Sequence, residues 1–186
     1  MNVVNTAVAA PLLAVVCSFT AFAAPLKVDA GKSTVSAVFK QMNVPVEAKF
    51  KQFSASIDYD AAKPQAGKAN VEIHIPSFDL GDPDYNREVQ KREWFNGVQF
   101  PKASFVSTVI KPVAAGKLDV TGRLTIKGKT MDVHFSLVVK KEASAQVFEG
   151  TLPISRLAFH IGEGEWKDTS MVADEVLIKF RVLTTQ

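Results

Sequence analysis

Apolar and polar side chains alternate along most of this chain, and this period of two constrains the fold more than any other feature. In residues 118–126 every even position is apolar or glycine and every odd position is polar. After Lys127-Gly128 the alternation resumes over residues 131–139. A strand points successive side chains to opposite faces, so each run predicts a strand with one buried face and one wet face. Two such runs around a glycine turn predict an antiparallel hairpin.

The same alternation recurs from end to end of the chain. Further runs cover residues 35–39, 46–59, 69–75, 103–109, 148–154 and 176–182. The phase of the run 46–59 slips near Lys51-Gln52, which predicts a β-bulge within one strand of about 45 Å at about 3.3 Å per residue. The pattern therefore predicts an all-β fold, a tall antiparallel barrel of about eight strands.

A single substantial helix is predicted between two of these strands. Asp82 is a suitable N-cap, Pro83 suits the first turn, and no glycine or proline follows until Asn96-Gly97. We therefore expect one short helix, continuing to Phe95, in a connecting segment. A further helical turn is expected around residues 155–158.

The N-terminal segment resembles an export signal. Residues 1–26 carry no Lys, Arg, Asp or Glu, and the apolar run 7–16 is shorter than the roughly 20 residues that span a bilayer. The small residues of Ala21-Phe22-Ala23 suit signal peptidase, so we expect a signal peptide over 1–23, a single domain over 24–186 and a periplasmic location. An uncleaved anchor is the alternative. Cleavage would remove Cys17, the only cysteine, and with it any disulfide or thiolate site.

Charge gives no indication of a nucleic-acid partner. The formal net charge is +3, and the lysines are scattered singly along the predicted strands. A nucleic-acid-binding surface would be a patch or stripe on a far more basic domain.

Acidic residues near the predicted helix have the spacing of a calcium loop, but the match is incomplete. Asp82, Asp84, Asn86 and Glu93 fall at ligand positions, yet Arg87 occupies the position that normally requires glycine. Helix capping accounts for the same acids, so we predict no metal.

Residues of catalytic type are present without a convincing arrangement. Asp132, His134 and Ser136 share one strand face, about 6.6 Å apart along it, with no second element to supply an oxyanion hole. His74 and His160 lack metal-ligand spacing, and a zinc site would require the fold to bring histidines together. A hydrolase-type enzyme using His160 with Asp168 or Asp174 remains a rival interpretation.

Phenylalanine is the most conspicuous residue of the predicted buried faces. Small closed barrels either fill their interior with side chains or hold a ligand there. Gly122 and Gly150 stand on buried faces where large side chains are expected, which favours a hollow interior. A barrel with a filled core, acting in stress or in protein interaction, is the alternative.

Ordered motifs across the chain resemble the YceI-like family of periplasmic polyisoprenoid-binding proteins. These are Ser33-Thr34-Val35, Phe50-Lys51-Gln52-Phe53, Trp94-Phe95, Phe100-Pro101-Lys102-Ala103-Ser104-Phe105, Val120-Thr121-Gly122-Arg123-Leu124, Ile154-Ser155-Arg156 and Val172-Ala173-Asp174-Glu175-Val176. Two positions depart from the family pattern: Ala48 stands where glycine is usual, and Ala158-Phe159-His160 replaces a common acidic-aromatic-Gly run.

The resemblance implies an extended lipocalin-like barrel with an isoprenoid tail in its apolar pore, and no catalysis. The ligand would be a quinone or a polyprenyl chain, with transient membrane contact, and a homodimer is compatible with this role. Trp94 and Trp166 are candidate lids, and Arg156 is a candidate for the polar head group or for a structural salt bridge. The remaining candidate pore residues are Phe39, Phe50, Ile73, Phe105, Leu124, Phe135, Phe148, Phe159 and Ile178.

Overall fold

The structure is a computed structural model that describes residues 26–185. The expected signal peptide and Cys17 lie outside the described residues.

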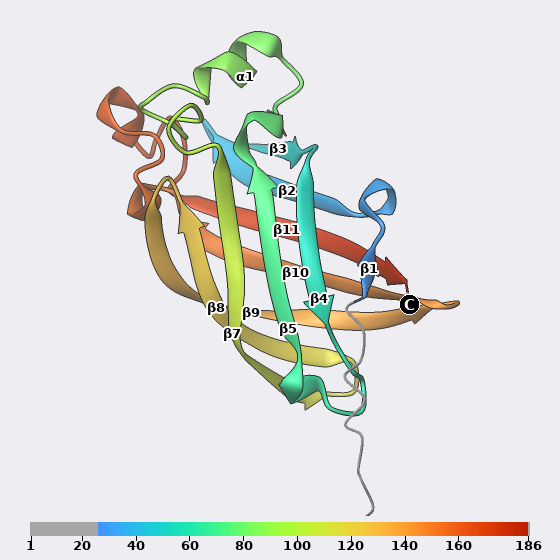
Figure 1. Ribbon diagram of the computed structural model, residues 1–186. Helices are drawn as coiled ribbons and strands as arrows, with labels where there is room; N and C mark the ends of the chain where they lie inside the picture. The colour runs from blue at the N-terminus through green and yellow to red at the C-terminus, as the bar shows by residue number, and fades with distance from the viewer. Residues whose placement is uncertain (1–25, 186) are drawn as a thin grey trace, which may run out of the picture.

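Antiparallel strands form one long sheet that curls into a barrel-like shell (Figure 1). The strands are β1 (Lys27–Val28), β2 (Thr34–Gln41), β3 (Val44–Phe50), β4 (Phe53–Asp58), β5 (Lys68–His74), β6 (Phe78–Asp79), β7 (Lys102–Ala114), β8 (Lys117–Ile126), β9 (Lys129–Glu142), β10 (Ala145–Ser155) and β11 (Glu175–Thr185). Their order in the sheet is β4-β5-β7-β8-β9-β10-β11-β2-β3-β6. The all-β, barrel-like fold class is confirmed.

The short strand β1 links two distant parts of this sheet. Lys27 and Val28 pair with the end of β11, and the preceding residue, Leu26, bridges to Ile57 of β4. The N-terminal end of the domain therefore helps to bring the curled sheet together at the end remote from α1 (Figure 1).

The prediction of one bulged strand over residues 46–59 is wrong. The chain breaks at Lys51-Gln52 into β3 and β4, which pair with different neighbours. The break is a corner held by Ser77, whose carbonyl oxygen accepts a hydrogen bond from the Lys51 N–H and whose hydroxyl oxygen accepts one from the Gln52 N–H. Register shifts of the bulge type occur in β7 instead, at Ser107/Val109 and Pro112/Ala114. Because one predicted strand is in fact two, residues 26–185 contain nine strands of six residues or more in place of the expected eight.

The helix begins where the sequence predicts but ends earlier. Asp82 caps α1 (Pro83–Glu88), accepting hydrogen bonds from the Asp84 and Tyr85 N–H groups. Beyond Val89 the chain continues in turns, because the Phe95 N–H bonds back to the Val89 carbonyl rather than to a helical partner. The remaining helical pieces are 3-10 turns: η1 (Ala30–Lys32), η2 (Pro64–Ala66), η3 (Ile75–Ser77), η4 (Leu157–Phe159) and η5 (Gly164–Lys167).

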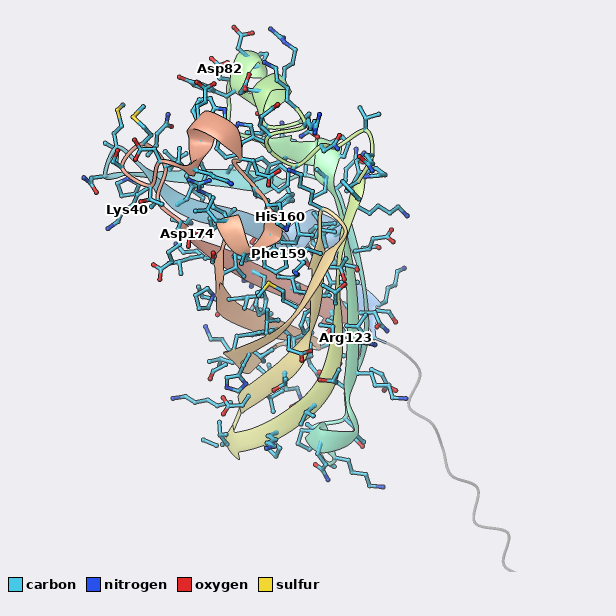
Figure 2. The ribbon with its side chains drawn as sticks, turned by 90° about the vertical axis from the view of Figure 1, so that its left-hand side faces the viewer. Lys40, Asp82, Arg123, Phe159, His160 and Asp174 are labelled. Atoms are coloured by element: carbon cyan, nitrogen blue, oxygen red, sulfur yellow. The ribbon has the colours of Figure 1, made fainter. Side chains whose placement is uncertain are left out.

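The alternating pattern sets which strand face enters the barrel. On β8, Leu118, Val120, Leu124 and Ile126 are buried, while Arg123 lies exposed on the outer face (Figure 2). The predicted hairpin joins β8 to β9 through Lys127-Gly128, both with positive φ. No helix within residues 26–185 has the length and apolar character needed to cross a membrane.

Candidate functional site

The interior of the barrel contains a first cavity, cavity A, of about 160 Å³. Strand side chains form nearly all of its wall, and the surface they present to the cavity is almost entirely carbon. Phenylalanine rings form a row along it, with centroid distances of 5.5 Å for Phe105–Phe135 and 5.6 Å for Phe135–Phe180. The lining includes Val35, Ile57, Tyr59, Val71, Ile73, Phe105, Ile110, Val120, Leu124, Phe135, Phe148, Leu152 and Phe180.

A second cavity, cavity B, of about 270 Å³ lies toward the end of the barrel that carries α1, η4 and η5 (Figure 1). Strands β2, β3 and β11 form one side of it, and residues of the two segments 83–95 and 161–172 form the other. Tyr85, which is 58% exposed, belongs to its lining, so cavity B reaches the surface. The lining includes Ala37, Phe39, Gln41, Val46, Phe78, Tyr85, Glu88, Val89, Trp94, Arg156, Ile161, Trp166, Val172 and Val176.

The two cavities are neighbours inside the barrel. Phe50, Phe95, Ile126 and Ile178 line both of them. The two neighbouring cavities form the apolar hollow of the barrel, and cavity B reaches the surface. A protein interior ordinarily has few voids larger than a water molecule, so a hollow of this size is a feature of the fold and not a packing defect.

The structure brings nearly all predicted pore residues to this hollow. Cavity A is lined by Phe50, Ile73, Phe105, Leu124, Phe135, Phe148 and Ile178. Cavity B is lined by Phe39, Trp94, Arg156 and Trp166. Phe159 is the exception, because η4 turns it into the packed core, where it is 2% exposed and lines neither cavity (Figure 2).

The buried-face glycines do not provide the hollow space that the sequence indicated. A Cβ on Gly122 would lie 2.5 Å from the Phe105 ring and 2.6 Å from the Val106 carbonyl oxygen. A Cβ on Gly150 would lie 2.5 Å from the Phe180 ring. These glycines let aromatic rings lie directly against the barrel wall, which is a known way to cover a glycine in a sheet.

Arg156 is neither free for a head group nor part of a salt bridge among residues 26–185. It is 2% exposed, and its guanidinium donates to five backbone carbonyl oxygens. The acceptors are Ile161 (2.9 Å), Gly162 (3.2 Å), Trp166 (2.7 Å), Val172 (2.7 Å) and Ala173 (3.0 Å). Burial lowers the pKa of Arg156, and the charge of Asp174 opposes that shift. An arginine remains protonated in proteins, so this cation holds the loop that covers cavity B.

The tryptophans lie beside that arginine. The rings of Trp94 and Trp166 are 5.2 Å apart, and the Arg156 guanidinium lies 5.8 Å from the Trp94 ring centroid. The Gly162 and Glu163 N–H groups both donate to the Glu93 carbonyl oxygen at 2.8 Å. The two non-strand segments over cavity B are therefore joined to each other.

The arrangement around His160 does not resemble a catalytic site. His160 Nδ1 lies 3.3 Å from Glu163 Oε1, not beside Asp168 or Asp174 (Figure 2). Asp174 accepts hydrogen bonds from Ser155 Oγ and the Leu157 N–H, and Asp168 accepts one from the Ser170 N–H. His160 has φ of 59° and caps η4. Left-handed backbone favours glycine, which accounts for the glycine that is usual at this position in the family pattern.

The other candidate chemistry is also accounted for by local structure. Asp132, His134 and Ser136 are exposed on the outer face of β9, where His134 contacts Thr121 and Ser136 bonds Asp119. Within residues 26–185 no group of three or more His, Cys, Asp or Glu side chains could hold a metal ion.

Several lining residues were missed by the sequence analysis. Tyr85, Val89 and Phe95 come from the segment around α1, Gln41 ends β2, and Val172 lies in the irregular segment before β11, where it bridges to Gln41. The spacing of Tyr85 and Val89, one helical turn apart, is the one signal that could have indicated an inward-facing side of α1. Irregular segments have no periodicity from which to predict an inward face.

The comparisons with known proteins agree with this geometry. The YceI-like domain model matches residues 26–183. The crystal structure of Burkholderia cenocepacia BcnA superposes with a TM-score of 0.84 at 52% identity, covering 86% of this chain and all of that one. A polyisoprenoid binding domain from Saccharophagus degradans has the same fold, with a TM-score of 0.70 at 18% identity, covering 86% of this chain and 97% of that one.

Curated sequences match over shorter stretches. Protein YceI of Salmonella arizonae is 36% identical over 84 residues, which are 45% of this chain and 44% of that protein. A UPF0312 protein of Pseudomonas syringae pv. tomato is 32% identical over 88 residues, 47% of this chain and 46% of that protein. The chain spans about half the length of the curated relatives it matches. The match to the domain model over residues 26–183 shows that this chain belongs to the YceI-like domain family.

Proposed function

We propose that this protein is a periplasmic, non-enzymatic carrier or reservoir for an isoprenoid lipid held in the elongated hollow. The observation that carries the proposal is the carbon-lined cavity A, which shares four lining side chains with cavity B, the cavity that reaches the surface. The polyisoprenoid binding domain of the same fold from Saccharophagus degradans supports this ligand class.

Burial of the isoprenoid tail would supply the binding energy. Removing apolar carbon from water is favourable by about 0.8 kcal/mol per methylene. Association costs an estimated 4–15 kcal/mol, roughly, in lost freedom of motion. A few isoprene units offset that cost, so few polar contacts are needed, in keeping with the nearly pure carbon surface of cavity A.

The role of a carrier also fits the chemistry around the hollow. His160 is paired with Glu163, Asp168 accepts a hydrogen bond within its own loop, and Asp174 accepts hydrogen bonds from Ser155 and Leu157. These groups are used to build the cover of cavity B. Export by the segment 1–23 would place the protein where a lipid must cross water between membranes, and loading would require transient contact with a membrane.

The proposal is tested by native mass spectrometry of protein purified gently from the periplasm, followed by lipid extraction. We expect the folded protein to carry an additional mass that the extract identifies as an isoprenoid. Val71→Trp places an indole in cavity A and should abolish this mass. Asn70→Trp is the matched control, because Asn70 precedes Val71 on β5 and points to the outer face. Wild-type protein that carries no lipid after gentle handling would contradict the proposal.

A further inference from the structure

We propose that cavity B selects isoprenoids with an uncharged head group, such as a quinone or an alcohol, over chains that end in a phosphate. This inference rests on the proposed function and specifies the chemistry of its ligand. It follows from how each charged group at this end of the barrel is used.

Among residues 26–185, Arg156 is the one cation that lines cavity B, and all of its N–H groups are in use. An arginine has five N–H groups. All five directions are taken, because the guanidinium donates to the carbonyl oxygens of Ile161, Gly162, Trp166, Val172 and Ala173. A phosphate could bind Arg156 only by displacing the loop that this residue holds.

Lys127 is the second buried cation at this end of the barrel, and it is also committed. Its side chain is 7% exposed. Its ammonium group donates to the carbonyl oxygens of Arg92 at 2.8 Å and His160 at 2.6 Å, and lies 3.5 Å from a Glu163 carboxylate oxygen. Lys127 lines neither cavity.

The other cations of the segments around cavity B, Arg87 and Arg92 among them, do not line it. Arg87 is paired with Asp84. Lys91 is paired with Glu88. Lys40 lies between Phe39 and Gln41 on β2, and because both of these line cavity B, the Lys40 side chain points to the other face of the strand. Lys167 is exposed on η5 and does not line the cavity.

In place of a free cation, the polar groups that line cavity B are a carboxylate and uncharged hydrogen-bond donors. Glu88, which is paired with Lys91, lines cavity B with a carboxylate, and a carboxylate gives an anionic head group no favourable partner. Gln41, Tyr85, Trp94 and Trp166 also line it, and the buried indole N–H of Trp94 has no hydrogen-bond partner within residues 26–185. Neutral donors of this kind suit a carbonyl or hydroxyl oxygen. Moving an unpaired phosphate from water to such a site is costly.

The inference is tested with two ligands that have the same tail. Geranylgeraniol and geranylgeranyl phosphate are titrated into delipidated protein at pH 8, where a phosphate monoester with a second pKa of about 6 is doubly charged. Trp94 and Trp166 are the only tryptophans of the chain, and both line cavity B, so their fluorescence reports binding. Calorimetry gives the dissociation constants. We expect the alcohol to bind more tightly by about tenfold or more.

Two charge-reversal variants test whether charge at cavity B sets the difference in affinity between alcohol and phosphate. Glu88→Lys should narrow the difference between alcohol and phosphate, because it places a cation at cavity B. Glu72→Lys is the matched control: Glu72 is also paired with a lysine, Lys102, but lies on the outer face of β5, so the difference should stay as in the wild type. Equal or tighter binding of the phosphate to wild-type protein would overturn the inference and leave the proposed function intact. Failure of both ligands to bind would overturn both.

Discussion

Cavity A and cavity B lie in the same barrel but are built in different ways. The wall of cavity A consists of strand side chains whose direction is set by the pleat of a hydrogen-bonded sheet. Cavity B has strands on one side only, and its other side is made of irregular segments held by Arg156 and by backbone contacts to Glu93. The difference suggests a rigid compartment for a tail and an adaptable one for a head group.

The dependence of cavity B on one cation gives the largest expected effect. Arg156→Ala would leave five carbonyl oxygens without their donor, each at a cost of about 1–3 kcal/mol when buried, so we expect a loss of at least about 3 kcal/mol in the free energy of unfolding. Urea denaturation measures this loss. Hydrogen exchange should increase in residues 157–173 more than in β8 and β9.

The control for this change is an arginine on the wall of the barrel. Arg123 is exposed on β8, so Arg123→Ala should change stability by no more than about 0.5 kcal/mol. If Arg156→Ala and Arg123→Ala had similar effects, cavity B would not depend on the guanidinium.

Close packing of the wall of cavity A predicts the next effect. In Gly122→Ala the added methyl group would meet the Phe105 ring and the Val106 carbonyl oxygen, so we expect a loss of about 1–3 kcal/mol in thermal or urea unfolding. Gly31→Ala is the control, because the nearest atom to its added Cβ is 3.5 Å away, an ordinary contact. If Gly122→Ala left the free energy of unfolding unchanged, the wall would have space for the added methyl group, as the sequence analysis predicts.

A smaller effect distinguishes a structural His160 from a catalytic one. Because His160 has left-handed backbone, His160→Gly should relieve strain and raise the free energy of unfolding by about 1 kcal/mol, with lipid content unchanged. His134→Gly, the same change on strand β9, should lower it by about 0.5–1 kcal/mol. Loss of lipid content in His160→Gly alone would indicate that the imidazole itself takes part in function.

The smallest effect concerns the start of the α1 segment and depends on pH. The hydrogen bond from Lys51, together with those from Asn86 and the Gly81 N–H, lowers the pKa of Asp79 to about 2. An unfolded aspartate titrates near about 3.9. The carboxylate therefore stabilises the fold at pH above 4, and this contribution is lost as the pH falls toward 2. The stability difference between wild type and Asp79→Asn should shrink over that range, and an Asp79 carbon signal titrating near 4 in NMR would contradict the assignment.

The contrast between the cavities also explains what could be predicted from the sequence. Alternation predicts that Phe105, Leu124 and Phe135 face the interior. A strand has only two faces, and the alternating pattern identifies the buried one. The phase shift of the alternation at Lys51-Gln52 predicts a bulge, but the structure has a corner there. A phase shift alone does not show that the segments on its two sides pair with different strands.

The end of the barrel that carries cavity B was less predictable. Phe95 and Val172 lie in irregular segments, where the sequence has no periodicity that predicts which side chains face the interior. The role of Arg156 depends on backbone carbonyl oxygens spread over residues 161–173. Every residue has such an acceptor, so the pattern of side chains cannot predict which ones Arg156 contacts. The sequence analysis predicts a head-group contact or a salt bridge for Arg156. In residues 26–185 the guanidinium instead donates to five backbone carbonyl oxygens.

The central claim is that the two neighbouring cavities bind a chain by enclosing its length, and affinity as a function of tail length tests it most directly. Geraniol, farnesol and geranylgeraniol, which differ by one isoprene unit each, are titrated by calorimetry into delipidated wild-type and Val71→Trp protein. At about 0.8 kcal/mol per buried methylene, each added unit should tighten binding to the wild type by about tenfold or more. The gain should stop at a shorter tail in Val71→Trp. Equal affinities for the three alcohols, or identical series in the two proteins, would contradict the account.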